Sequence, residues 1–525
     1  MALQWLSLVG IIWLQSISAT NSNFPAYSSQ LKFLLSLSQL QLNNLAFASD
    51  AGKLFGFFSG MAAVYLPLWL VLLIGSALGF IGYGVQYLFL LTNNISSLPY
   101  SLVFLLTVLA GNSICWINTV CYVIAIENFP LDRQLAVGLS TSYQGLSAKI
   151  YSDVVDVVFK SSPSLSSRVL DDQRARSYLL LNSILPLVVC SIASPLVRVV
   201  NTARSKRLSG GFLVIFAITI FTGIYAVITS LGSRNKRVSP PLMILIGMCV
   251  FLMAPLVVPL MEKIRENMEH KCLIRSYGKK ICDESSMEEG EEKNGGVEFE
   301  QVVKDEGVLV DDDEEMGVKV MMKRLNFWLY FFVYMFGATV GMVYLNNLGQ
   351  IAESRGGSNV NTSSLVSLAS SFGFFGRLFP CLLDYHLTRA KYKVSRPSLM
   401  ALMMVPMTVA FFLLLNSSNI CLHISTATIG ICTGAITSIS VSTTAELFGT
   451  KNFGVNHNIV VTNIPIGSFL FGDMAALLYR EHGLANGDGK CMGIKCYQTS
   501  FIIWGSLCFL GTFLAIILHS RSKKT

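Results

Sequence analysis

A polar segment from about Glu262 to Lys323 interrupts a chain that is otherwise strongly apolar, and it constrains the fold more than any motif. Its centre, Asp283 to Glu315, holds 15 of the 31 acidic residues and only two cations, a net charge of 2 − 15 = −13. Because the whole chain has a net charge of +8, the other residues carry 8 + 13 = +21. A block of like charges cannot pack a core. The sequence therefore predicts two apolar regions joined by a disordered linker.

The composition of the apolar regions indicates a membrane protein. Of the 525 residues, 52% are hydrophobic and 13% are charged, whereas soluble domains carry roughly 25% charged residues. Apolar runs of about 20 residues recur along the chain, and each is long enough to cross a bilayer as a helix. We therefore predict an all-α polytopic membrane protein. The positive net charge is then a signal of topology and not a footprint for nucleic acid.

The apolar runs divide the chain into four regions. Residues 1–209 hold six runs, an N-terminal six-helix bundle, and 210–261 hold two additional apolar helices. Residues 262–323 are the acidic linker, and 324–525 form a C-terminal six-helix bundle. The first run, Trp5 to Ala19, has no Lys or Arg before it, so we interpret it as a spanning helix and not as a signal peptide.

The additional pair leaves two alternatives open. Arg234, Lys236 and Arg237 join the two runs and would lie outside the cell or in a lumen, against the usual distribution of basic loops. Either this rule is violated locally, or the pair is a re-entrant hairpin that never crosses. Both alternatives leave the orientation of the second bundle unchanged.

Basic loops and glycosylation sequons agree on one orientation. With both termini in the cytosol, the basic clusters at 198–207, 389–396 and 521–524 are cytosolic. The three N-x-S/T sequons, at Asn94, Asn361 and Asn416, then fall on the opposite face, where glycosylation occurs. We expect a plasma-membrane or endomembrane protein.

Two short patterns occur in both halves, as expected for a transporter built from repeats. The sequence AGKLF at 51–55 matches GRLF at 376–379, near the end of the second helix of each bundle. Glu127 and Arg133, before the fifth helix, match Glu446 and Lys451 in the second half. We predict that these charges, with the pairs Asp50–Lys53 and Arg377–Asp384, form conformational gates at the cytosolic ends of helices.

The first 160 residues resemble the nodulin-like domain of plant proteins of the nuclear-fusion-defective type. The residues that support the resemblance are Asn21, Asn23, Phe24, Tyr27, Ser28, Leu31, Lys32, Gln39, Leu42, Asn43, Asp50, Gly52, Lys53, Gly56, the run Glu127–Pro130, Gly138 and the run Gly145–Ala148. In the family's pattern a glycine often follows the arginine that is Arg133 here, whereas this chain has Gln134. The family is similar to the major facilitator superfamily, which implies two six-helix bundles around a central cavity.

Lys149 is the main candidate for a substrate site. It lies at i+11 from Gly138, on one helical face with Ser142 and Gly145, and a buried lysine facing a cavity would attract an anion. The alternative is a local pair with Asp153 one turn later, which would cancel the charge.

The resemblance implies that the first and fourth helices of each bundle line the cavity. On these helices the candidates are Asn21, Asn112, Trp116, Tyr334 and Tyr344, of which each aromatic could equally serve packing. His457 could carry a coupling proton, or it could be a satisfied polar group near a helix start.

Signatures of enzymes are absent from the sequence. Lys53 lacks the flanking residues of a phosphate-binding loop, and the six histidines have no metal-ligand spacing, so we expect no cofactor and no metal. Cys491 and Cys496 could form a disulfide if their loop faces an oxidising compartment, or remain two reduced thiols. We predict a secondary-active transporter for a small organic anion such as a carboxylate. The alternative is a membrane scaffold or receptor that recruits a cytosolic partner through 283–315.

Overall fold

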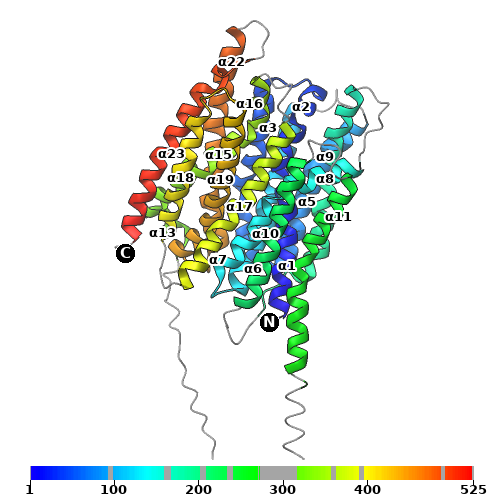
Figure 1. The fold of residues 1–525 in the computed structure, drawn as a ribbon, viewed down its shortest axis with the longest axis vertical. Coiled ribbons are helices and arrows are strands. Elements are labelled where there is room, and N and C mark those ends of the chain that lie inside the picture. The colour runs from blue at the N-terminus through cyan, green and yellow to red at the C-terminus, as the bar shows by residue number, and fades with distance from the viewer. Residues whose placement is uncertain are drawn as a thin grey trace, which may run out of the picture.

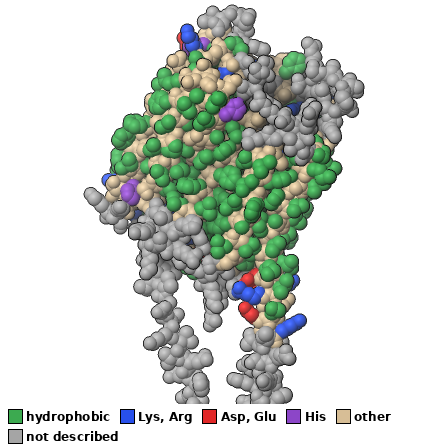
Figure 2. Space-filling view, viewed as in Figure 1, with side chains coloured by type: hydrophobic (Ala, Val, Ile, Leu, Met, Phe, Trp, Pro, Cys, Tyr) green, Lys and Arg blue, Asp and Glu red, His purple; other side chains and the backbone are tan. Residues whose placement is uncertain are grey.

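The structure is a computed structural model that describes residues 2–92, 99–158, 167–200, 209–232, 240–269, 271, 316–355, 362–389, 395–485 and 491–522. Long helices lie side by side in one bundle, and hydrophobic side chains cover the middle of the face seen in Figure 2. Among the described residues, 12 helices are long and apolar enough to cross a membrane. The predicted all-α polytopic membrane fold is confirmed (Figure 1).

The first half contributes six rods, several of them assembled from consecutive short helices. They are α1 (Ala2–Ser18), η1 (Thr20–Asn23) and α2 (Phe24–Leu34); α3 (Gln39–Ala51), η2 (Gly52–Phe55) and α4 (Gly56–Tyr65); α5 (Leu68–Leu91); α6 (Tyr100–Asn128); α7 (Arg133–Gln144) and α8 (Ser147–Val158); α9 (Ser167–Ala193) with η4 (Ser194–Leu196). The first rod is longer than the predicted Trp5 to Ala19, because Pro25 sits at the start of α2 and continues the helix.

The second half repeats this plan. Its rods are α13 (Val318–Lys323), α14 (Leu325–Tyr334), the π-helical η6 (Met335–Thr339), α15 (Val340–Asn346) and α16 (Leu348–Ser354); α17 (Thr362–Arg389); α18 (Arg396–Leu413); α19 (Asn419–Phe448); α20 (Phe453–Val461), α21 (Asn463–Gly467), the π-helical η7 (Ser468–Gly472) and α22 (Asp473–Ala485); and α23 (Lys495–Ser522).

Two further helices lie between the halves in sequence. They are α10 (Ser209–Gly232) and α11 (Pro241–Met253), which continues through η5 (Ala254–Leu256) as a helix to Glu269, beyond the boundary predicted at 261. Both have the length and composition of spanning helices, and the choice between a crossing pair and a re-entrant hairpin stays a prediction. The acidic segment 283–315 lies outside the described residues.

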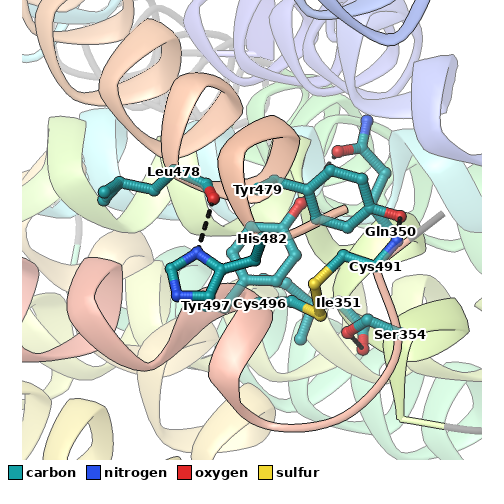
Figure 3. Close-up of a disulfide and its surroundings, with 9 residues drawn as sticks. All are labelled: Gln350, Ile351, Ser354, Leu478, Tyr479, His482, Cys491, Cys496 and Tyr497. Atoms are coloured by element: carbon teal, nitrogen blue, oxygen red, sulfur yellow. Dashed lines mark hydrogen bonds between the residues drawn. A yellow bond between two sulfur atoms is a disulfide. The ribbon is translucent and has the colours of Figure 1, made fainter. Parts of the chain in front are cut away.

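Both chain termini lie toward one end of the bundle, and α22 lies at the other (Figure 1). We call the first the termini end. There, Gln4 donates a hydrogen bond to the Asn128 carbonyl and Arg521 donates one to Asn326. We call the second the disulfide end, because it contains a disulfide between Cys491 and Cys496 (Figure 3). The backbone N–H of Gly493, between these cysteines, donates to the Ser354 carbonyl and fastens the loop to α16.

Helix boundaries follow ordinary capping chemistry. Ser38 and Gln41 form a reciprocal capping box at the start of α3, which satisfies backbone N–H groups that have no partner within the helix. Pro67 and Pro99 precede α5 and α6 in extended conformation. Gly449 ends α19 with φ 81°, a conformation that costs glycine little.

Small residues allow close approach between helices, as is usual in membranes. Gly75, Gly79 and Gly82 form one face of α5 at i, i+4 and i+7 and lie against α6. A Cβ at Gly75 would lie 2.5 Å from the Trp116 Cβ, and one at Gly82 would lie 2.7 Å from the Leu106 carbonyl oxygen. These contacts fix the rotation of α6 about its axis, and therefore decide which of its residues face inward.

Candidate functional site

A cavity of about 180 Å³ lies between the two six-helix units. Helices from both halves line it, including η2, α6, α14, α17, α19 and α20. The polar side chains in its wall are Asn21, Ser22, Asp50, Lys53, Asn118, Thr119, Tyr122, Gln144, Tyr334, Asn346, Ser370, Arg377, Thr433, Thr437, His457 and Asn458. A polar cavity among spanning helices is expensive to maintain, so it is the leading candidate for a binding site.

The cavity contains one cation from each half. Lys53 Nζ lies 2.6 Å from Asp50 Oδ1, and both side chains are buried. Arg377 forms no ion pair with any carboxylate of the described residues; it donates to the Gly373 carbonyl at 3.4 Å, and its buried Nε has no hydrogen-bond partner there. With one acid and two cations, these three groups give the cavity a formal net charge of 2 − 1 = +1.

The two cations occupy equivalent positions in the two bundles. A Cβ on Gly52 would lie 2.3 Å from the Val108 carbonyl oxygen of α6, and one on Gly376 would lie 2.1 Å from the Ile431 carbonyl oxygen of α19. In each bundle the glycine therefore presses the second rod against the fourth, and the next residue projects its cation into the cavity. The sequence repeat therefore corresponds to a repeat in the structure. The prediction that these charges lie at the cytosolic ends of helices is wrong, because both lie in the middle of their rods.

Lys149 is not among the residues that line the cavity. It forms a buried ion pair with Asp153 at 2.5 Å, which is the alternative that the sequence left open. The physical reason is a break at Gly145 and Leu146, between α7 and α8, which changes the helical phase. The i+11 spacing from Gly138 therefore does not place Lys149 on the same face.

The two residues that we predicted on the fourth helix, α6, do not line the cavity. Trp116 packs against Gly75 of α5, and the backbone nitrogen of Asn112 lies against Gly52. The cavity wall has Cys115, Asn118, Thr119 and Tyr122. Their i, i+3, i+4 and i+7 spacing is a visible signal, but the sequence gives no means to choose these polar positions over Asn112 and Trp116, which neighbour them on the helix.

The remaining candidates divide between the cavity and packing. Asn21 and Tyr334, which we predicted in the cavity, line it, and so does His457, the candidate for a coupling proton. His457 Nδ1 lies 3.1 Å from the Thr444 hydroxyl, and its ring stacks on Phe453. Tyr344 does not line the cavity, because its hydroxyl bonds to Thr426 at 2.7 Å and its ring packs on Phe411.

The other predicted gate charges lie at the termini end. Glu127 is exposed at the end of α6, and Arg133 starts α7, without an ion pair between them. Glu446 pairs with Arg396 at 3.3 Å, and Lys451 is exposed before α20. The side chain of Asp384 lies outside the described part of the chain, so the predicted Arg377–Asp384 pair has no structural description.

The termini end is closed by backbone-level contact between the halves. A Cβ on Gly60 of α4 would lie 2.6 Å from the Gly454 carbonyl carbon of α20. Beside it, the Asn458 amide donates to the Thr119 hydroxyl at 2.9 Å. The disulfide end has a second, larger cavity of about 610 Å³, which we call the vestibule.

Of the three sequons, Asn416 falls on a described residue and Asn94 and Asn361 do not. Asn416 is exposed at the disulfide end, where its backbone carbonyl accepts a hydrogen bond from Arg355. The disulfide of Cys491 and Cys496 lies at the same end, near Tyr479, Tyr497 and Gln350 (Figure 3).

Comparisons with known proteins match both halves of the chain. Residues 4–260 match a family model described as Nodulin-like, and residues 310–525 match one described as NFD4, C-terminal domain. The chain is 38% identical to Protein NUCLEAR FUSION DEFECTIVE 4 of Arabidopsis thaliana, across 99% of this chain and 89% of that protein. It is 23% identical to a probable transporter, MCH1, of Yarrowia lipolytica, across 34% of this chain and 39% of that protein.

Solved structures of transporters have a similar fold. FucP, a major facilitator superfamily transporter in an outward conformation, superposes with a TM-score of 0.51 at 11% identity, over 98% of each chain. The proton:xylose symporter XylE superposes with a TM-score of 0.53 at 12% identity, over 98% of this chain and 94% of XylE.

Proposed function

Because the chain belongs to the plant nodulin-like, NUCLEAR FUSION DEFECTIVE 4-type family of the major facilitator superfamily, we propose that it is a secondary-active transporter for a small organic anion. The observation that carries the proposal is Arg377, a cation in the central cavity without a carboxylate partner in the described residues. A guanidinium forms two parallel hydrogen bonds with a carboxylate, and removal from water strengthens them.

Charge balance favours a substrate with one negative charge. The cavity's net charge of +1 is neutralised by one carboxylate, whereas a second would have to displace Asp50 from Lys53. The volume of about 180 Å³ suits a small ligand. The original basis for an anion, Lys149, is replaced by Arg377, because Asp153 already neutralises Lys149.

Alternating access accounts for the two unequal ends. Rods from both halves touch at backbone level near the termini end, while at the disulfide end the vestibule lies between them and side-chain contacts join α3 to the second half. A rocking motion would open one end as it closes the other. With the termini in the cytosol, Asn416 and the disulfide would face a lumen or the cell exterior, where glycans and disulfides form.

His457 is the histidine that lines the cavity, and in this proposal it carries a coupling proton. It lies beside Tyr122, whose ring it meets edge-on at 5.5 Å, and it contacts Thr444. In this proposal a proton gradient accelerates uptake, and His457→Gln removes the acceleration while substrate binding at Arg377 persists.

The test is uptake of labelled small carboxylates into proteoliposomes of purified protein, with and without a pH gradient. Arg377→Gln keeps a polar side chain but removes the charge, and we expect uptake at limiting substrate to fall by roughly tenfold or more, as loss of a charge-assisted hydrogen bond predicts. The matched control is Lys149→Met with Asp153→Leu, which removes the other buried ion pair as a unit and should retain uptake.

Three outcomes of this uptake assay would count against the proposed anion transport. Equal loss in both variants would indicate general damage. Retained uptake in Arg377→Gln would contradict the anion site. No uptake of any carboxylate by folded wild-type protein would contradict the substrate class.

A further inference from the structure

We propose that Asp50 is the gate between the vestibule and the central cavity, a role that rests on the proposed transport function. Asp50 lines the central cavity, Ser468 lines the vestibule, and Asn346 lines both. The Ser468 hydroxyl donates to Asp50 Oδ2 at 2.6 Å, and the Asn346 amide lies 3.4 Å from the same oxygen. This cluster is therefore the partition between the two spaces.

The partition joins the two halves of the protein. Asp50 belongs to α3 of the first half, whereas Asn346 and Ser468 belong to α15 and η7 of the second. Because the carboxylate bonds to both, α3 cannot move away from η7 and α15 without breaking these contacts. A route from the vestibule to the cavity requires that separation.

Asp50 is the innermost of three contacts along one face of α3. Asn43, Phe47 and Asp50 stand at i, i+4 and i+7, and each touches the second half. Asn43 accepts a hydrogen bond from Gln350 at 2.8 Å, and the Phe47 ring lies 5.3 Å from that of Phe469. All three contacts lie at the same interface, and Asp50 is the one with a charge.

The gate carboxylate is also held by a cation of the central cavity. Asp50 Oδ1 lies 2.6 Å from Lys53 Nζ, while Oδ2 holds the second half. An anion bound at Arg377 leaves this ion pair in place but adds a negative charge to the same cavity, which attracts the Lys53 ammonium and changes how strongly the Asp50 carboxylate is held. Occupancy of the cavity is thus coupled to the gate through Lys53.

The wall of the cavity supplies a native reporter of gate opening. Cys115 is a buried free thiol that lines the central cavity next to η2. A membrane-impermeant methanethiosulfonate reagent added on the disulfide side reaches it only through the partition. Modification is followed by mass spectrometry on the peptide that contains Cys115, so that other thiols do not contribute, and Cys115→Ser gives the background.

Two variants weaken the partition in different ways. Ser468→Ala removes the inter-half hydrogen bond and leaves the Asp50–Lys53 pair intact, and Asp50→Asn removes the charge. We expect each to raise the rate of Cys115 modification by about tenfold, the effect of one charge-assisted hydrogen bond on an opening equilibrium. Ser442→Ala is the control, because its hydroxyl donates only to Ile439 within its own helix, and its rate should stay at the wild-type value.

Unchanged modification rates in folded Ser468→Ala protein would overturn the gate. This assay needs no transport, so the two proposals can fail separately. Faster modification in a protein that takes up no carboxylate would keep the gate and reject the substrate class. Uptake that proceeds with no effect of Ser468→Ala on accessibility would keep the transporter and reject the gate.

Discussion

Gly138 of α7 lies against Cys381 of α17, where the two halves meet near the termini end. A Cβ added at Gly138 would lie 1.6 Å from the Cys381 Sγ and 3.3 Å from the Cys381 Cβ. Cys381 is fully buried, and its thiol donates to the Gln134 carbonyl at 3.3 Å, so a rotation of the thiol would break this hydrogen bond and leave the tight contact with the Cys381 Cβ. We predict that Gly138→Ala destabilises the protein through this one contact.

The magnitude follows from the overlap. Restoring an ordinary contact of 3.4 Å requires a displacement of 3.4 − 1.6 = 1.8 Å between atoms on different rods. Overpacking in a close-packed interior costs about 1–3 kcal/mol, and an overlap of this size belongs in the upper part of that range. The entropy of unfolding is roughly 2.1 cal/mol/K per residue, and the shift in Tm is the loss of stability divided by the entropy of the whole chain. For a chain of this length, a loss of about 2–3 kcal/mol therefore lowers Tm by about 2–3 °C.

The assay is a double-mutant cycle by differential scanning fluorimetry in detergent. Cys381→Ala deletes the overlapping sulfur, so the double variant should be more stable than the sum of the two single effects by at least about 1 kcal/mol. Gly210→Ala is the matched control: it has the same helix-propensity change, and nothing lies within 4 Å of its added Cβ. Additive effects in the cycle, or equal losses for Gly138→Ala and Gly210→Ala, would refute the reasoning.

Three further predictions concern the two ends of the bundle. Replacing both Cys491 and Cys496 by Ser should lower the free energy of unfolding by about 2 kcal/mol, since the bond closes a loop with a sequence separation of 5, and wild-type protein heated with and without reductant should show the same difference. Asn416→Gln should run faster on a gel than the wild type by the mass of one glycan, and glycosidase treatment should remove this difference. Identical mobility of the untreated wild type and variant would mean that Asn416 carries no glycan, because the disulfide end is cytosolic or the sequon is unused. Arg396→Ala should change the free energy of unfolding by less than about 1 kcal/mol, because Glu446 in that pair is 55% exposed and water screens it. A larger loss in thermal unfolding would contradict the assignment of this pair as a weak surface ion pair.

Apolar run length and charge determined the outline of this protein from its sequence. The all-α polytopic membrane fold depends on local composition, which is readable residue by residue, whereas the division into six, two and six helices around an acidic linker stays a prediction. The repeat of Gly52–Lys53 in Gly376–Arg377 was also visible, because close helix contact beside a cation requires the same two residue types in each bundle.

Only the tertiary structure decided which polar residues meet in the cavity. Asn112 and Trp116 of α6 do not line the cavity, and the contact that turns Trp116 away from it is made by Gly75, which lies on another helix. The predicted place of Lys149 is wrong because a break at Gly145 changes the helical phase. The predicted place of Arg377 at a helix end is wrong because α17 continues to Arg389, and the sequence did not show where this rod ends. Hydrophobic periodicity records that a side chain is buried, whereas the identity of its neighbours depends on the packing of rods that are far apart in the sequence.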